Sequence, residues 1–193
     1  MYVFTNNWFD PHLPNFEKFL NQYSNQEYHI LEIGSHEGKS TTWFIDNILN
    51  HDKSSITSID PYLTSDTTTP VNEHTRNKFL SNISNSKYPN KLYQYVDLSM
   101  NVIPKLDKKY DLIYIDGSHL SLDIMYDAVN SWNLLKPDGI LWFDDYGSMG
   151  NSTWSSPQQT INAFLKCLDP KDYELLFSGW QLAIRKKNIK CDV

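Results

Sequence analysis

Cysteine is scarce in this chain, whose 193 residues contain only Cys167 and Cys191. Two cysteines, one of them near the end, cannot build a disulfide framework or a four-ligand zinc site. Basic clusters are also missing before the short run Arg185-Lys186-Lys187, and the net charge is -6. Because nucleic-acid binding requires a basic face, we expect no nucleic-acid partner.

Long apolar stretches are absent as well. No run is long enough to span a bilayer, and the beginning "MYVFTNNWFD" lacks the basic and apolar regions of a signal peptide. We therefore expect a soluble, cytoplasmic protein without a membrane partner, while a homo-oligomer stays open. The length favours one domain over 1–193, with a cap at 1–27, a core at 28–185 and a tail at 186–193.

Strand-like runs alternate with helical patterns along the chain. Strands are predicted at 28–34, 54–60, 91–96, 110–117 and 139–145, and helices at 15–23, 40–50, 75–84, 121–135 and 157–168. The runs that meet at Ser178-Gly179 predict a hairpin. The alternation predicts an α/β fold with a single Rossmann-like, doubly wound sheet, mostly parallel, that closes with an antiparallel C-terminal hairpin. Ligands bind such sheets at the carboxyl ends of strands, where the long connections 63–74 and 146–156 are candidate lids.

The stretch "IGSHEGKST" (33–41) is similar to a phosphate-binding loop, but its spacing and charge argue against one. A P-loop has four residues between its glycine and its Gly-Lys pair, whereas only three separate Gly34 from Gly38. Glu32 and Glu37 would also repel phosphates. A dinucleotide loop requires a glycine where His36 stands, so we expect no NAD binding. A cationic ligand suits this acidic loop better. The alternative is that the segment is a tight strand-to-helix turn with a purely structural role.

The pattern Glu32-Ile33-Gly34-x-x-x-Gly38 resembles motif I of the class I S-adenosylmethionine methyltransferases. That resemblance implies that the glycines admit the amino-acid portion of the cofactor and that Glu32 helps to hold its ammonium group. The loop residues assigned to cofactor binding are Gly34, Ser35, His36, Gly38 and Ser40.

Further cofactor contacts are predicted after the next two strands. Asp60 in "SIDPY" ends a strand, and a carboxylate there can accept the two ribose hydroxyls of an adenosine. Tyr62 resembles the aromatic residue that covers adenine in the family, and Ser99 matches a hydroxyl position of its third cofactor segment. Leu98 replaces the acid that usually precedes this serine. A turn cap at Asp60 and a stray surface Tyr62 are the structural alternatives.

A second group of polar residues lies in "IDGSH" (115–119) and "WFDDY" (142–146). Asp116, Asp144 and Asp145 end two strands that we expect to be neighbours, and three packed anions call for a cation. Their oxygens suit Mg²⁺ or Ca²⁺, and such a divalent ion can lower the pKa of a substrate hydroxyl. His119 follows Asp116 closely and is a plausible base for the departing proton. Taken singly, each residue could instead belong to a solvated turn.

The segments "EIGSHEGKST", "IDPY", "YDLIYIDGSH" and "LKPDGILWFDD" together resemble a methyltransferase branch with an Asp-Gly-x-His signature. This branch is similar to metal-dependent catechol-type and macrolide-sugar O-methyltransferases. The resemblance implies the class I methyltransferase fold and S-adenosylmethionine as cofactor. It also implies Asp116, Asp144 and Asp145 as Mg²⁺ ligands, with Asp116 a cofactor contact too, and Asp116 and His119 as catalytic residues.

The sequence therefore predicts an O-methyltransferase that acts on a hydroxyl of a small molecule, sugar or glycan with the help of a divalent metal. Two alternatives stay open. One is a metal-dependent NTPase or hydrolase with a degenerate P-loop, and the other is a non-catalytic subunit that binds the cofactor for a partner.

Overall fold

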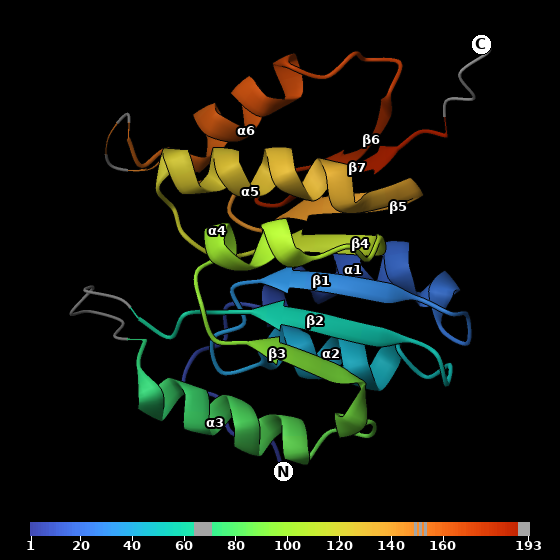
Figure 1. Cartoon of the computed structure of the whole chain (residues 1–193), viewed down its shortest axis with the longest axis vertical. Coiled ribbons are helices and arrows are strands. Elements are labelled where there is room, and N and C mark those ends of the chain that lie inside the picture. Colours follow the sequence, from blue (N-terminus) through green and yellow to red (C-terminus); the bar gives the residue numbers. More distant parts are fainter. Residues whose placement is uncertain (64–70, 149, 151, 153, 189–193) are drawn as a thin grey trace. The chain divides into compact units, whose positions relative to one another are not determined.

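The computed structural model describes residues 1–63, 71–148, 150, 152 and 154–188 (Figure 1). Parts of both predicted lids and the end of the predicted tail therefore lie outside the described residues. Contacts within the chain divide it into two units, Met1–Leu98 and Ser99–Val193, and each is described by itself. The prediction of a single domain stays a prediction.

The first unit contains three parallel strands in the order β3-β2-β1. Its strands are β1 (His29–Ile33), β2 (Ser55–Ile59) and β3 (Leu92–Tyr95), and its helices are α1 (Leu13–Leu20), α2 (Lys39–Asn47) and α3 (Glu73–Ser84), with short 3₁₀ turns at Asp10–His12, Asn21–Tyr23 and Pro89–Lys91. Every residue of β2 is buried, as expected of a central parallel strand. Ile33 pairs with Ile59, so β1 and β2 end side by side. The residues that follow, Gly34 and Asp60, are therefore neighbours.

The second unit contains four strands in the order β4-β5-β7-β6. They are β4 (Tyr110–Ile115), β5 (Leu135–Phe143), β6 (Tyr173–Ser178) and β7 (Leu182–Lys186), and the helices are α4 (Ser99–Val102), α5 (Ser121–Leu134) and α6 (Pro157–Lys166), with a 3₁₀ turn at Ile103–Lys105. β4 and β5 are parallel, and β7 is antiparallel to both β5 and β6. Ile115 pairs with Phe143, which brings Asp116 and Asp144 to neighbouring strand ends.

The predicted α/β architecture with a C-terminal antiparallel hairpin is confirmed, but some boundaries were wrong. A strand was expected over 139–145, whereas β5 begins at Leu135 and includes the whole Lys-Pro-Asp-Gly run. Asp138 takes a left-handed conformation with φ +63, and the pairing register shifts between Tyr110 and Leu112. An irregularity therefore accommodates the turn residues inside the strand. No helix that the structure describes is long and apolar enough to cross a membrane.

Candidate functional site

The loop between β1 and α2 has an unusual backbone. Gly34, His36 and Gly38 all have positive φ, at +88, +46 and +81. A side chain on Gly38 would also meet the ring of Phe79 at 2.8 Å, so this position admits only glycine. Left-handed conformations cost free energy for residues other than glycine, and His36 therefore needs support from its surroundings.

Asp60 supplies much of that support. Its Oδ2 accepts hydrogen bonds from the backbone N–H groups of Ser35 and His36 at 3.0 and 2.9 Å, and its Oδ1 accepts one from Tyr62 at 2.7 Å. The residue is only 7% exposed. Asp60 thus closes the loop from the end of β2, a contact that the predicted ribose role did not include.

Glu32 lies beneath the same loop and is completely buried. The hydroxyls of Ser40 and Thr41, in the first turn of α2, donate to its two oxygens at 2.5 Å each. Burial raises the pKa of Glu32 to about 7, although these two hydrogen bonds favour the ionised form. The predicted cofactor residues Glu32 and Ser40 therefore bond to each other and tie the strand to the helix.

Tyr62 and His36 have different surroundings in the loop region. Tyr62 is buried with its ring edge-on to Phe79, and its hydroxyl lies 3.2 Å from the Ser35 hydroxyl. Burial raises its pKa above the ordinary value. His36 is half-buried beside the exposed ring of Trp8, with the ring centres 5.5 Å apart, and burial lowers the pKa of its imidazole.

The first unit brings together most of the predicted cofactor residues, namely Glu32, Gly34, Ser35, His36, Gly38, Ser40, Asp60 and Tyr62. Ser99 and Asp116 belong to the second unit. Their assignment to the cofactor stays a prediction.

Ser99 begins α4 and hydrogen-bonds to Asp127 of α5. Asp127 is 2% exposed, and its Oδ1 has no hydrogen-bond partner among the described residues. Burial raises its pKa to about 6. Sequence reasoning missed this residue, although an acid at a buried position of an amphipathic helix was a visible signal.

The acids of the second unit converge as predicted. Asp116, Asp144 and Asp145 each present a carboxylate oxygen, and these oxygens lie within 4.8 Å of one another. The Tyr114 hydroxyl is 2.7 Å from Asp144 Oδ1 and 3.2 Å from Asp116 Oδ2, and Gln181 Nε2 also donates to Asp144. Sequence reasoning missed Tyr114 and Gln181 because each lies in a strand-like run that is mostly apolar.

His119 lies beside this cluster. Its Nε2 is 2.8 Å from Asp145 Oδ2, and more than half of its side chain is exposed. The hydrogen bond to Asp145 and the negative charge of that residue raise the pKa of His119 above its ordinary value. A neutral His119 that donates Nε2–H to Asp145 keeps its lone pair on Nδ1, which can then accept a proton.

A small pocket opens next to His119. Its polar side is formed by His119, Asp144 and Asp145, and its remaining lining residues are Ile115, Gly117, Ser118, Ile124, Phe143, Pro157 and Ile161. An apolar wall opposite a few convergent polar groups is typical of a small-molecule site.

The donor set of the cluster fits a hard divalent cation. All three candidate ligands are carboxylates, the half-buried side chains leave room for water, and Mg²⁺ prefers oxygen ligands of this kind. Tyr114 and Gln181 hold the candidate ligand Asp144 in the way that outer hydrogen bonds orient metal ligands. The residues present are therefore compatible with the metal that the resemblance implies.

Solved structures define the class of fold. The O-methyltransferase TomG from Streptomyces achromogenes, solved with S-adenosylmethionine, is 15% identical with a TM-score of 0.70, covering 92% of this chain and 80% of its own. A putative rRNA methylase from Clostridium thermocellum is 11% identical with a TM-score of 0.71, covering 96% and 99%. MycE from the mycinamycin pathway, solved with Mg and S-adenosylhomocysteine, is 15% identical with a TM-score of 0.64, covering 93% and 51%. The fold is that of the class I methyltransferases.

The family follows from the sequence. A methyltransferase domain family matches residues 31–146, which is more than half of the chain. The chain therefore belongs to this methyltransferase family. No curated protein sequence matches it.

Proposed function

We propose that this protein is an S-adenosylmethionine-dependent O-methyltransferase that methylates a hydroxyl group of a small molecule, preferably a sugar, with the assistance of a divalent metal. The observation that carries the proposal is the hydrogen-bonded pair of His119 and Asp145 in a pocket beside two further acids. A proton acceptor next to candidate metal ligands suits the activation of a hydroxyl.

The first unit would hold the cofactor through its loop. Gly34 lacks a side chain, so the backbone can approach a ligand closely there. The missing side chain of Gly38 instead makes room for the ring of Phe79. Asp60 keeps the Ser35 and His36 amides in place, and its Oδ1, which accepts one hydrogen bond among the described residues, can accept a second from a ribose hydroxyl. The acidic side chains at the loop, Glu32 and Asp60, suit a cationic cofactor rather than a phosphate.

His119 would accept the acceptor's proton. With Nε2–H directed to Asp145, the basic nitrogen is Nδ1, and Asp145 stabilises the imidazolium that forms. The hydroxyl oxygen takes the methyl group from the sulfonium, and S-adenosylhomocysteine and a methyl ether are the products. The protein contributes mainly orientation and stabilisation of charge.

Asp116, Asp144 and Asp145 would hold the metal. When bound, a divalent cation lowers the pKa of a hydroxyl that coordinates it. Tyr114 and Gln181 hold Asp144 in its orientation. The apolar wall of Ile124, Phe143 and their neighbours would receive the acceptor's carbon skeleton.

An rRNA acceptor is the competing possibility, because the fold also occurs in a putative rRNA methylase. The net charge of -6 argues against it, since a polyanionic substrate requires a basic face. A small hydroxylated acceptor is compatible with the small, open and partly apolar pocket beside His119.

The decisive experiment has two arms. Calorimetry with S-adenosylhomocysteine and with ATP tests the cofactor, and we expect binding of the first alone. Radiolabelled methyl transfer from S-adenosylmethionine to sugars, catechols and RNA, with Mg²⁺ or with chelator, tests the acceptor. Binding of ATP alone would favour an NTPase, and transfer to RNA alone would refute a small-molecule acceptor.

A further inference from the structure

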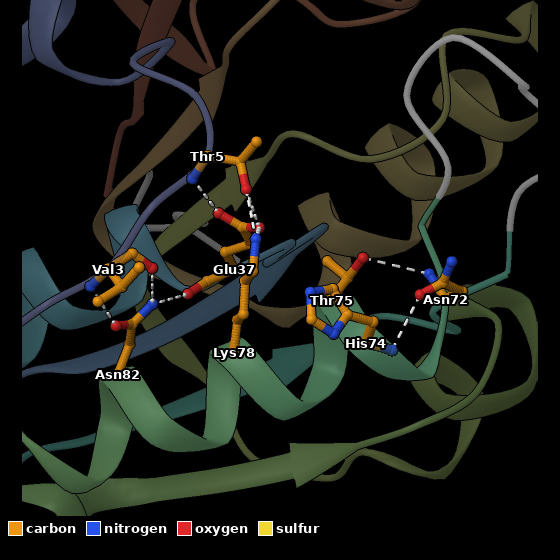
Figure 2. A network of polar contacts seen from close by, with 8 residues as sticks. All are labelled: Val3, Thr5, Glu37, Asn72, His74, Thr75, Lys78 and Asn82. Carbon is orange, nitrogen blue, oxygen red and sulfur yellow. Dashed lines mark hydrogen bonds and ion pairs between the residues drawn. The ribbon is translucent and has the colours of Figure 1, made fainter.

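Glu37 lies in the glycine loop and links three segments of the first unit (Figure 2). Its carboxylate accepts hydrogen bonds from Thr5 N at 2.5 Å, Thr5 Oγ1 at 2.6 Å and Lys78 Nζ at 2.8 Å. Its backbone oxygen accepts one from Asn82 Nδ2 at 2.9 Å. Thr5 belongs to the N-terminal segment, and Lys78 and Asn82 lie one turn apart on α3. The loop is thus bonded to both.

The carboxylate of Glu37 accepts three hydrogen bonds within this network. Glu37 is 5% exposed, and burial alone would raise its pKa, but the hydrogen bonds from Lys78 and Thr5 outweigh burial and lower it. A buried charge requires a partner of opposite charge or hydrogen-bond donors. If one of these partners is removed, the free-energy cost of taking the charge out of water is no longer compensated. The Thr5 hydroxyl also accepts a hydrogen bond from Lys78 Nζ, so it connects both charged groups.

The N-terminal segment makes further contacts with α3, with the loop and with the start of α2. Asn82 exchanges hydrogen bonds with the backbone of Val3, at 2.8 and 2.9 Å, and thereby fixes the segment on α3 (Figure 2). Trp8 lies beside His36, and Lys39 pairs with Asp10 at 2.8 Å. Contacts at residues 36, 37 and 39 therefore hold the loop and the start of α2 to the N-terminal segment.

These contacts complement those of Asp60. Asp60 binds the amides of Ser35 and His36 from the end of β2. Glu37, the next residue of the loop, is itself bonded to the N-terminal segment and to α3. His36, which needs support for its positive φ, lies between the two anchors. Loss of the outer anchor should let the loop leave its strained conformation more often.

We infer that Glu37 is a positioning residue for the cofactor, and that it keeps the 34–38 loop in its binding conformation by tying it to Thr5 and Lys78. The inference rests on the proposed cofactor function of this loop. Ligand affinity falls in proportion to the fraction of molecules in the competent conformation, so the network sets the affinity without touching the ligand.

The test compares three variants of the full chain. Thr5→Val removes the bridging hydroxyl and keeps the shape, Thr5→Ser restores the hydroxyl, and Tyr2→Phe removes another contact of the same segment, to Asp46 near the end of α2. Calorimetry should give an S-adenosylhomocysteine Kd about fivefold higher for Thr5→Val. Thr5→Ser and Tyr2→Phe should match the wild type. Thermal unfolding measured in parallel reports any general loss of stability.

A second measurement needs no ligand. Amide hydrogen exchange of residues 34–38 should be faster in Thr5→Val than in Tyr2→Phe, because only the first variant loosens the loop. Equal exchange and equal affinity in the two variants would overturn the inference and leave the network a purely structural one. Wild-type protein that fails to bind S-adenosylhomocysteine would overturn the proposed function instead, while faster exchange in Thr5→Val would still support the positioning role.

Discussion

Glu32, Glu37 and Asp60 of the first unit are 0%, 5% and 7% exposed, and each is bonded to hydroxyl, ammonium or amide groups of the protein itself. The three acids of the second unit are half-buried, and their oxygens gather within 4.8 Å. The first arrangement uses negative charge to fix a backbone, whereas the second leaves negative charge concentrated where a cation can reach it. The acids at the glycine loop thus serve as scaffold, whereas those that follow β4 and β5 form a candidate site, and the two groups differ in burial.

The largest expected effect is in the second unit. We expect His119→Ala to lower turnover by roughly 10²–10⁴-fold, because a positioned general base contributes about that much. Affinity for S-adenosylhomocysteine should stay unchanged. The wild-type rate should fall as the pH drops through the pKa of His119, which Asp145 raises above the ordinary 6.5, and the variant should lack this limb. Steady-state kinetics against pH measures both effects.

The control for this prediction is His74→Ala, since His74 is exposed in the first turn of α3 and should not affect turnover. Turnover by His119→Ala at the wild-type rate would show that the second unit uses another base.

Asp60→Ala should have the next largest effect, now on the cofactor side. It removes the acceptor of three backbone N–H groups as well as the predicted ribose contact. Hydrogen bonds to a charged group contribute about 1.5–3 kcal/mol, which corresponds to roughly a 10- to 100-fold loss of affinity. Calorimetry with S-adenosylhomocysteine measures it, and an unchanged Kd would mean that Asp60 neither shapes nor contacts the site.

Gln181→Leu tests whether the acid cluster of the second unit binds a cation. Gln181 is 1% exposed and donates to Asp144, so its loss should disorient a predicted metal ligand. We expect Mg²⁺ affinity to fall about tenfold, as is usual when the partner of a metal ligand is removed. Mg²⁺ titration in the absence of cofactor measures the change. Wild-type protein with no measurable Mg²⁺ binding would contradict the metal assignment, and chelator should then leave activity intact.

The smallest expected effect concerns stability rather than activity. The pKa of Glu32 is raised to about 7, so the folded state holds a proton that the unfolded chain releases near 4.5. Its contribution to stability is present below pH 4.5 and is lost progressively as the pH rises to about 7. The free energy of unfolding, measured with urea, should change less between pH 5 and pH 7 for Glu32→Gln than for the wild type. An identical change in both proteins would mean that a group other than Glu32 causes the pH dependence of stability.

The order and type of the main elements could be predicted because periodicity is local. β4 is almost entirely apolar, and α5 repeats its buried positions at helical spacing. The convergence of Asp116, Asp144 and Asp145 could also be predicted, since the ends of adjacent parallel strands meet. The early start of β5 at Leu135 could not, because Lys-Pro-Asp-Gly favours a turn by local preference and pairing with β4 overrides it.

Side-chain partners were less accessible to sequence reasoning. Thr5 and Glu37 are 32 residues apart, and Gln181 and Asp144 are 37 apart. Nothing in the spacing of such residues indicates that they will meet. Glu37 could be recognised from the sequence as an acid in the loop, but only its contacts with Thr5 and Lys78 give it a role.

The buried acids Glu32 and Asp127 also affect how heat is exchanged when the protein unfolds. With pKa values of about 7 and about 6 in the folded chain, both carry protons in mildly acidic solution that an unfolded chain would release. Unfolding near pH 6 therefore delivers protons to the buffer, and the buffer's own heat of protonation adds to the signal. Calorimetric unfolding enthalpies should differ between phosphate and imidazole buffers at the same pH, and the difference counts the protons released.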